Sequence, residues 1–143
     1  MNHEPFVIER TFNAPYGKVW NAITNKEEMK KWYFNLKEFK PEIGFEFEFW
    51  GEDGDLKFLH RCRITEVVAG KKLSYSWTYP EYKGSSLLTF ELFPEGANTR
   101  LRLTHTGLES FPQDHQSFKK ENFVAGWTEI IGKNLKEYLE GTS

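Results

Sequence analysis

The chain has 143 residues, a net charge of −2 at neutral pH and a single cysteine. A slightly acidic chain without a basic stripe is not expected to bind nucleic acid. One cysteine excludes an internal disulfide, no apolar run is long enough to span a membrane, and residues 1–5 do not resemble a signal peptide. We therefore expect one domain over residues 1–143, located in the cytoplasm.

The N-terminal part of the chain predicts one strand followed by two short helices. Residues 6–13 alternate between apolar and polar side chains, as in a half-buried strand. Pro15 follows, and proline suits the first turn of a helix. Asn25 with Glu28 three residues later is a capping-box pattern, which predicts a second short helix reaching about Tyr33.

From Phe45 onward the hydrophobic period is two, as expected for strands with one buried face. Phe45, Phe47 and Phe49 alternate with glutamates, and turn signals such as Asp53-Gly54 separate one strand from the next. We therefore predict five strands joined by short hairpins, which is an antiparallel meander. The later strands are predicted over residues 58–68, 72–79, 87–93 and 99–106.

The C-terminal part predicts an irregular stretch and then one long helix. Residues 107–116 are either a lid over a cavity or a plain connector whose Phe111 packs on the core. Residues 117–139 have helical periodicity with one broad apolar face, and Gly141 is placed to cap the C-terminus. At about 1.5 Å per residue, such a helix crosses a small domain.

These elements predict an α+β fold. A curved antiparallel sheet of about six strands wraps on the long C-terminal helix, and two short helices follow the first strand. A curved sheet that grips one helix tends to leave a gap along the helix flank. Aromatic residues make up 17% of the chain, so the interior is either a bulky close-packed core or a cavity with aromatic walls.

If the helix is held away from the sheet, the inward side chains would line a pocket for a flat or greasy ligand. Asn134 interrupts the apolar face of the predicted helix, near Phe123 and Trp127. Its amide is either held by a local hydrogen bond or serves as a polar anchor for the ligand. The expected ligand-binding set is Phe47, Phe49, His60, Tyr75, Trp77, Phe90, His105, Phe123, Trp127, Ile131 and Asn134.

Few residues have the pattern of a reactive site. His60 and Cys62 share one side of a strand and would need His105 as a third ligand to hold zinc. Cys62 is better explained as a small buried apolar residue. We therefore expect no metal or cofactor. His105 should face the cavity, either as a neutral imidazole bonded to a backbone carbonyl or a tyrosine, or as a general base. The chain has no Gly-x-Ser-x-Gly motif and no phosphate-binding glycine loop, so no catalytic set is predicted.

Short motifs over nearly the whole chain carry a family resemblance. They are Ala14-Pro15, Val19-Trp20, Ala22-Ile23-Thr24, Leu101, Leu103, Thr104-His105, Gly107-Leu108, Gly126-Trp127, Leu135 and Tyr138-Leu139. The chain thereby resembles the START-like (SRPBCC) superfamily, and more narrowly the branch named after the activator of the heat-shock-protein-90 ATPase. The resemblance implies a helix-grip fold with a cavity between sheet and helix. The eukaryotic activators carry a further N-terminal domain that makes much of the chaperone contact, so the branch name does not imply an activity.

The sequence leaves three functions open. The first is a non-enzymatic module that binds a small apolar or amphipathic molecule in the aromatic cavity. The second, from the branch resemblance, is a single-domain chaperone cofactor that acts by protein contact. The third, from superfamily relatives, is a cyclase- or hydrolase-like enzyme on a hydrophobic substrate, with His105 and a tyrosine as its acid/base pair. The edge strands of an open sheet allow a monomer or a homodimer.

Overall fold

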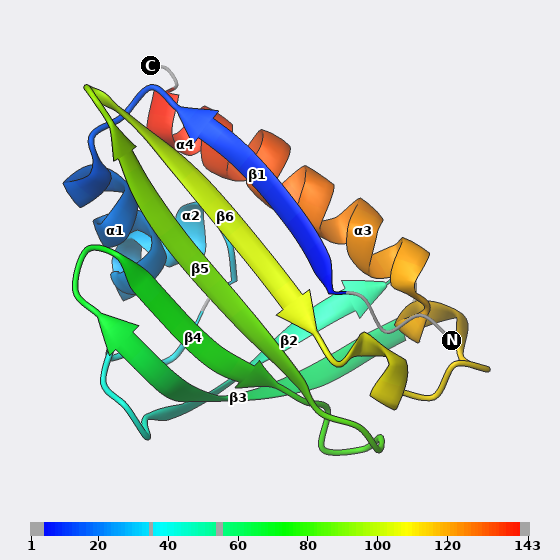
Figure 1. The fold of residues 1–143 in the computed structure, drawn as a ribbon. Helices are drawn as coiled ribbons and strands as arrows, with labels where there is room; N and C mark the ends of the chain where they lie inside the picture. Colours follow the sequence, from blue (N-terminus) through cyan, green and yellow to red (C-terminus); the bar gives the residue numbers. More distant parts are fainter. Residues whose placement is uncertain (1–4, 35, 54–55, 141–143) are drawn as a thin grey trace.

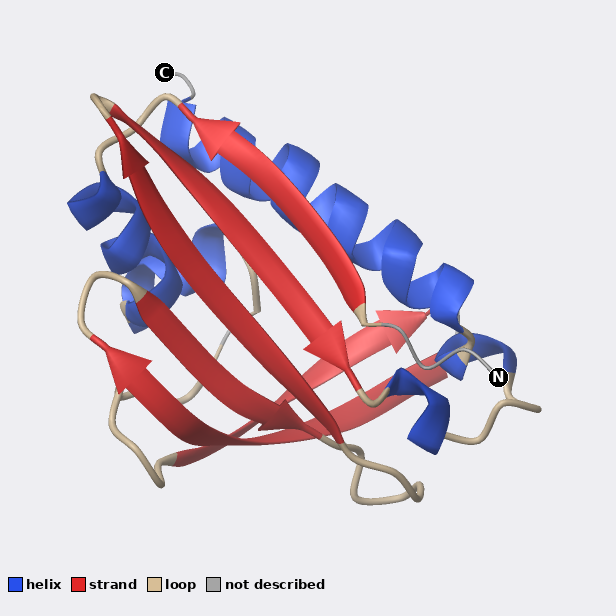
Figure 2. Cartoon of the chain, in the orientation of Figure 1, coloured by secondary structure: helices blue, strands red, loops and turns tan. Residues whose placement is uncertain are grey.

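The structure, a computed structural model, describes residues 5–34, 36–53 and 56–140. A six-stranded antiparallel sheet curves around one long C-terminal helical segment, and two short helices pack at one end (Figures 1 and 2). The strand order is β1-β6-β5-β4-β3-β2. The second to sixth strands therefore form the predicted meander, and the first strand adds to its far edge. The predicted α+β helix-grip fold is confirmed.

Alternating hydrophobicity sets which face of each strand is buried. Along the last strand, for example, buried and half-buried residues alternate without a break. The hairpin turn predicted at Asp53-Gly54 extends beyond the described residues. The turn between the strands predicted over residues 87–93 and 99–106 is shorter than expected, because Pro94 and Glu95 still pair with the next strand. The strands are β1 (Phe6–Phe12), β2 (Glu46–Asp53), β3 (Leu56–Val68), β4 (Lys72–Trp77), β5 (Ser86–Glu95) and β6 (Asn98–Thr106).

The two short helices are α1 (Tyr16–Thr24) and α2 (Lys26–Trp32). Asn25 caps α2 as predicted: its side-chain oxygen accepts hydrogen bonds from the backbone N–H groups of Glu27 and Glu28, at 2.9 and 3.3 Å. The Glu28 carboxylate does not complete a capping box. It accepts a hydrogen bond of 2.9 Å from the hydroxyl of Tyr138, and so ties α2 to the C-terminal end of the chain.

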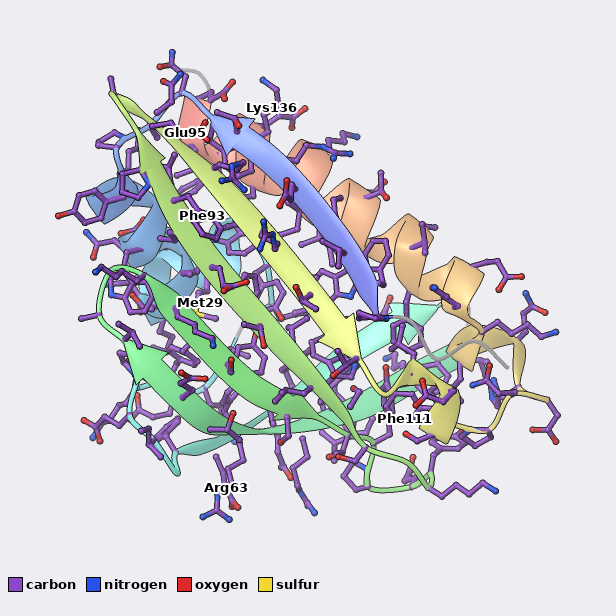
Figure 3. All side chains as sticks on the ribbon, in the orientation of Figure 1. Met29, Arg63, Phe93, Glu95, Phe111 and Lys136 are labelled. Carbon is purple, nitrogen blue, oxygen red and sulfur yellow. The ribbon has the colours of Figure 1, made fainter. Side chains whose placement is uncertain are left out.

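The irregular stretch before the long helix packs onto the core. It contains two single 3₁₀ turns, η1 (Leu108–Ser110) and η2 (Gln116–Phe118). Phe111 and Phe118 are each 1% exposed. Of the two readings of this stretch, buried anchors on both sides of the loop favour the connector. Figure 3 shows Phe111 at this end of the sheet, beside the turn that follows the last strand.

The long helical segment is not one α-helix. It consists of α3 (Lys120–Glu129), the π-helical turn η3 (Ile130–Leu135) and α4 (Lys136–Glu140). The buried side chains along it recur every four residues: Phe123, Trp127, Ile131, Leu135 and Leu139. A four-residue step in an α-helix drifts by about 40° around the axis. A π-turn holds more residues per turn, so η3 turns the buried stripe back toward the sheet.

The π-turn also changes the position of Asn134. A continuous α-helix would place Asn134 on the same side as Phe123 and Trp127. In the structure Ile131 and Leu135 occupy the buried stripe at this level, each at 0% exposure, and Asn134 is half-buried beside them. The expectation that Asn134 projects into the middle of the apolar face is therefore wrong, because hydrophobic periodicity does not reveal a π-turn. The Gly141 cap lies outside the described residues.

The sheet face turned away from the helix carries charged side chains. Glu9 on β1 forms ion pairs with Arg100 and Arg102 on β6, and both guanidinium groups lie over the ring of Phe93 on β5. Figure 3 shows Phe93 on this outer face. The core lies on the opposite, concave face. None of the described helices is both long and apolar enough for a membrane span.

Candidate functional site

One pocket opens between the β2–β3–β4 side of the sheet and the N-terminal half of the long helical segment. Its cavity volume is about 130 Å³. Glu52, Asn122 and Gly126 are exposed at its rim, so the pocket is open to solvent there. The walls are mostly aromatic. The lining residues are Phe34, Gly51, Glu52, Phe58, His60, Trp77, Tyr79, Ser117, Phe118, Asn122, Phe123, Gly126, Trp127 and Ile130.

The two-residue period of the strands and the four-residue stripe of the helix bring these side chains together. On β3, Phe58 and His60 point to the concave face, and Trp77 ends β4 on the same face. From the helix, Phe123 and Trp127 lie one turn apart and face the sheet. The rings of Trp77 and Trp127 meet edge to face, with centroids 5.3 Å apart. This geometry is one that aromatic pairs prefer.

His60 lies at the centre of the aromatic wall on the sheet side. Its ring stacks on Phe49, with centroids 4.6 Å apart and planes at 13°. Trp77 meets it edge to face at 4.9 Å, and the ring of Tyr79 lies 4.8 Å away. The imidazole is therefore held on several sides by aromatic rings, which fixes its orientation.

A glycine makes room for this imidazole. A Cβ at Gly51 would lie 2.6 Å from Cε1 of His60, closer than real Cβ atoms approach other heavy atoms. Gly51 pairs with Phe58 across the β2–β3 ladder, and its lack of a side chain lets the His60 ring lie against the β2 backbone. A larger residue at this position would displace the ring.

The hydrogen bond of His60 assigns its tautomer. Nδ1 lies 3.0 Å from the carbonyl oxygen of Phe58, and because a carbonyl only accepts, Nδ1 carries the proton. Burial lowers the pKa of the imidazole to about 4, although the carbonyls of Phe58 and Phe49 favour the protonated ring. His60 is thus neutral at physiological pH, and its Nε2 carries a lone pair.

His105 lies deeper, where both of its ring nitrogens form hydrogen bonds. The indole N–H of Trp127 donates to Nδ1 at 3.1 Å, so the ring proton is on Nε2. That N–H donates to the hydroxyl of Ser86 at 2.8 Å, and the hydroxyl in turn donates to the Trp77 carbonyl at 2.8 Å. Burial lowers the pKa of His105 to about 3. The ring is neutral, and its partners are a tryptophan and a serine instead of the carbonyl or tyrosine expected.

This chain of bonds affects the enzymatic hypothesis. A general base needs a free nitrogen within hydrogen-bond reach of a substrate proton. Both nitrogens of His105 are occupied, and the side chain is 0% exposed. His105 therefore orients Trp127 and connects the helix to β5 and β6.

The structure brings four members of the predicted ligand-binding set to the pocket: His60, Trp77, Phe123 and Trp127. Phe49 and His105 lie directly behind its wall. The other five do not line it. Tyr75 bonds the hydroxyl of Tyr33 at 2.8 Å, and Phe47 borders a separate surface hollow. Phe90 and Ile131 belong to the close-packed core, and Asn134 is half-buried on the helix.

Sequence reasoning missed several aromatic members of the wall. Phe58 and Tyr79 lie on the predicted strands in phase with His60 and Trp77, so strict alternation would have found them. Phe34 lies outside the strands and helices, where no period indicates direction. Phe118 lies in the 3₁₀ turn η2, although the sequence predicted it in the long helix, which begins only at Lys120. The rings of Phe58 and Phe118 are 5.4 Å apart, and they form the end of the pocket nearest the connector.

Cys62 follows His60 on the same strand face and belongs to the core. It is 1% exposed, and burial raises the pKa of its thiol. Within the described residues, no three His, Cys, Asp or Glu side chains are grouped closely enough to hold a metal ion. His60 and Cys62 face the same side because alternate residues of a strand do.

Comparison with known proteins supports the fold and the family. Similar solved structures include a protein from Rhizobium loti (TM-score 0.81, 22% identity, covering 96% of this chain and 98% of that one). Another is a protein from Mesorhizobium loti (TM-score 0.76, 26% identity, covering 98% of this chain and 99% of that one). A third is CalU16 from Micromonospora echinospora (TM-score 0.72, 22% identity, covering 94% of this chain and 75% of that one). No curated protein matched the chain. The family model described as "Activator of Hsp90 ATPase homolog 1-like protein" matches residues 13–140, and the chain therefore belongs to this family.

Proposed function

We propose that this protein binds a small apolar or amphipathic molecule by placing a flat ring in the pocket between the β2–β3–β4 side of the sheet and α3. The observation that supports this most directly is the wall itself, in which aromatic side chains from the sheet, the helix and the connector converge on one solvent-accessible opening. Ligand pockets typically combine such apolar walls with a few polar groups that orient the ligand.

The size of the pocket limits what enters it. Its volume of about 130 Å³ is close to the roughly 150 Å³ of an engineered apolar cavity that holds benzene, and below the roughly 300 Å³ at which pockets for drug-sized ligands begin. One six-membered ring therefore fits. A larger molecule would place one ring inside and extend the rest past the rim at Glu52 and Asn122.

A non-enzymatic role agrees with the state of His105. His105 has no free nitrogen, so the acid/base pair expected for a cyclase- or hydrolase-like enzyme has no base at that position. The likeness to solved structures supports the fold and names no ligand for this chain. Chaperone stimulation stays a prediction from the family resemblance. A titration of a chaperone ATPase with the purified protein would test it.

Gly126 offers a variant that blocks the pocket without disturbing the core. It lines the pocket, it is exposed, and a Cβ built there meets no heavy atom within 4 Å. Gly126→Leu would put a branched side chain at the opening. It would also remove a glycine from a helix interior, which should stabilise the helix by about 0.5–1 kcal/mol. Ala125→Leu is the matched control, because Ala125 precedes Gly126 on the helix, is exposed and does not line the pocket.

The test is an NMR titration of the ¹⁵N-labelled protein with fluorobenzene. Wild type and Ala125→Leu should show saturable shifts of the Trp77 and Trp127 indole resonances, and Gly126→Leu should lose them while remaining folded. Native mass spectrometry of protein purified without organic solvent would show any ligand retained from the cell. The proposal fails if wild type shows no saturable shift, or if Gly126→Leu binds as well as wild type.

A further inference from the structure

Nε2 of His60 belongs to the sheet-side wall and has no hydrogen-bond partner among the described residues. Nδ1 donates to Phe58, so Nε2 of the neutral ring can only accept. The other backbone group that acts on the ring is the Phe49 carbonyl, which is also an acceptor and cannot donate to Nε2. Among the described residues, every fully buried side-chain nitrogen or oxygen has a partner. Nε2 therefore retains accessible surface, and His60 lines the pocket.

From this geometry we infer that the pocket is selective for rings that carry a hydrogen-bond donor, such as phenols and N–H heteroaromatics, whose O–H or N–H is accepted by Nε2 of His60. The inference rests on the proposed function and specifies its ligand class. The ring of the ligand would lie among Trp77, Trp127 and Phe123, and its donor would point to the sheet side.

The surroundings of His60 keep this selectivity fixed. The ring cannot rotate freely, because Phe49 stacks on one face at 4.6 Å and the backbone at Gly51 lies against Cε1. Rotation by 180° about the ring axis would also break the bond to Phe58. The lone pair therefore keeps one direction, and a pre-oriented acceptor adds to binding without an ordering cost.

The same arrangement should reject two other classes of ring. A ring without a donor would cover the lone pair of Nε2 and leave it without water or a partner, which is unfavourable for a buried acceptor. A ring with a carboxylate would meet the lone pair of Nε2 and the side chain of Glu52 at the rim. Neither of these groups donates a hydrogen bond to an anion.

The experiment compares phenol with fluorobenzene, which has nearly the same shape and no donor, and with benzoate. Dissociation constants from NMR titration should show phenol bound at least about tenfold more tightly than fluorobenzene, with benzoate weakest. His60→Phe keeps an aromatic wall and removes the acceptor, so the ratio of the two affinities should fall to about one.

A second measurement uses the wild-type protein alone. Long-range ¹H–¹⁵N spectra of the imidazole should show a protonated Nδ1 and an unprotonated Nε2 at His60. Phenol should shift the Nε2 resonance in the direction of a hydrogen-bonded acceptor, and fluorobenzene should not. This spectrum decides the question even if His60→Phe fails to fold.

The outcomes separate the two proposals. If none of the three rings binds, the proposed function is wrong and the inference with it. If phenol and fluorobenzene bind equally, or if phenol leaves the Nε2 resonance of His60 unchanged, the pocket binds rings but the donor selectivity is overturned. Tighter binding of benzoate than of phenol would also overturn it.

Discussion

Lowering the pH from 7 to 5 should destabilise the fold through its two buried histidines. Burial lowers the pKa of His60 to about 4 and that of His105 to about 3, whereas an imidazole in the unfolded chain titrates near pH 6.5. In this window the unfolded chain binds more protons than the folded one. The stability that the neutral histidines contribute is therefore fully present above the unfolded pKa and is lost as the pH falls.

The magnitude follows from these pKa values. At pH 5 the unfolded imidazoles are almost fully protonated and the folded ones are almost fully neutral. The difference lowers the free energy of unfolding by about 2 kcal/mol per histidine, and by about 4 kcal/mol for both. Hydrogen bonds to Arg102, Lys30 and Lys136 lower the pKa of three carboxylates in the folded state, those of Glu9, Glu27 and Glu140 respectively. These folded-state carboxylates therefore titrate below the range from pH 5 to 7.

Urea denaturation at pH 7, 6 and 5 at constant ionic strength would measure the effect. His60→Phe should lose about half of the pH dependence, whatever its stability at pH 7, because only His105 then remains buried and neutral. The remaining histidines are common to both proteins and cancel in the comparison. A wild-type loss below about 1 kcal/mol, or an unchanged slope in His60→Phe, would show that the buried imidazoles do not have the assigned protonation states.

Three further substitutions, with Trp50→Phe as a control for the first, test the packing by denaturant unfolding. Trp127→Phe removes the hydrogen-bond donor to His105 and should lower the free energy of unfolding by about 1–3 kcal/mol. The control Trp50→Phe, at a site 60% exposed, should change it by less than about 0.5 kcal/mol. Equal effects would contradict the hydrogen bond from Trp127 to His105. Ile131→Ala empties a site with 0% exposure and should cost about 2–5 kcal/mol, and a smaller loss would mean that η3 repacks. Arg102→Ala should cost under about 1 kcal/mol, because its ion pairs lie on the surface, and a larger loss would indicate a cooperative network.

Most of the fold could be predicted from the sequence because its signals are local. The alternation of Phe45, Phe47 and Phe49 with glutamates, and the cap at Asn25, each indicate an element without knowledge of the rest of the chain. Boundaries were less well predicted. Thr78 pairs with Arg61 only as an isolated bridge, so β4 ends earlier than the alternation predicts.

The pocket was predicted less well because it depends on non-local packing. His60, Trp77, Phe123 and Trp127 were found by facing direction alone. Phe34 comes from a segment without periodicity, and Phe118 lies before the helix in which it was predicted. Their positions follow from tertiary contacts, of Phe34 with Phe49 and of Phe118 with Phe58. Local patterns do not show whether a buried side chain fills space or borders it, so the predicted set includes Phe90 and Ile131, which the structure places in the close-packed core.

The π-turn makes the long helical segment into two separately phased halves. The half before it presents Phe123 and Trp127 to the pocket, and the half after it presents Leu139 to the core. A π-turn is equivalent to one extra residue in an α-helix, so it adds a fixed rotation between the two halves. The face that borders the pocket and the face that closes the fold are therefore set separately along one helical segment, which a continuous α-helix of the same length could not do.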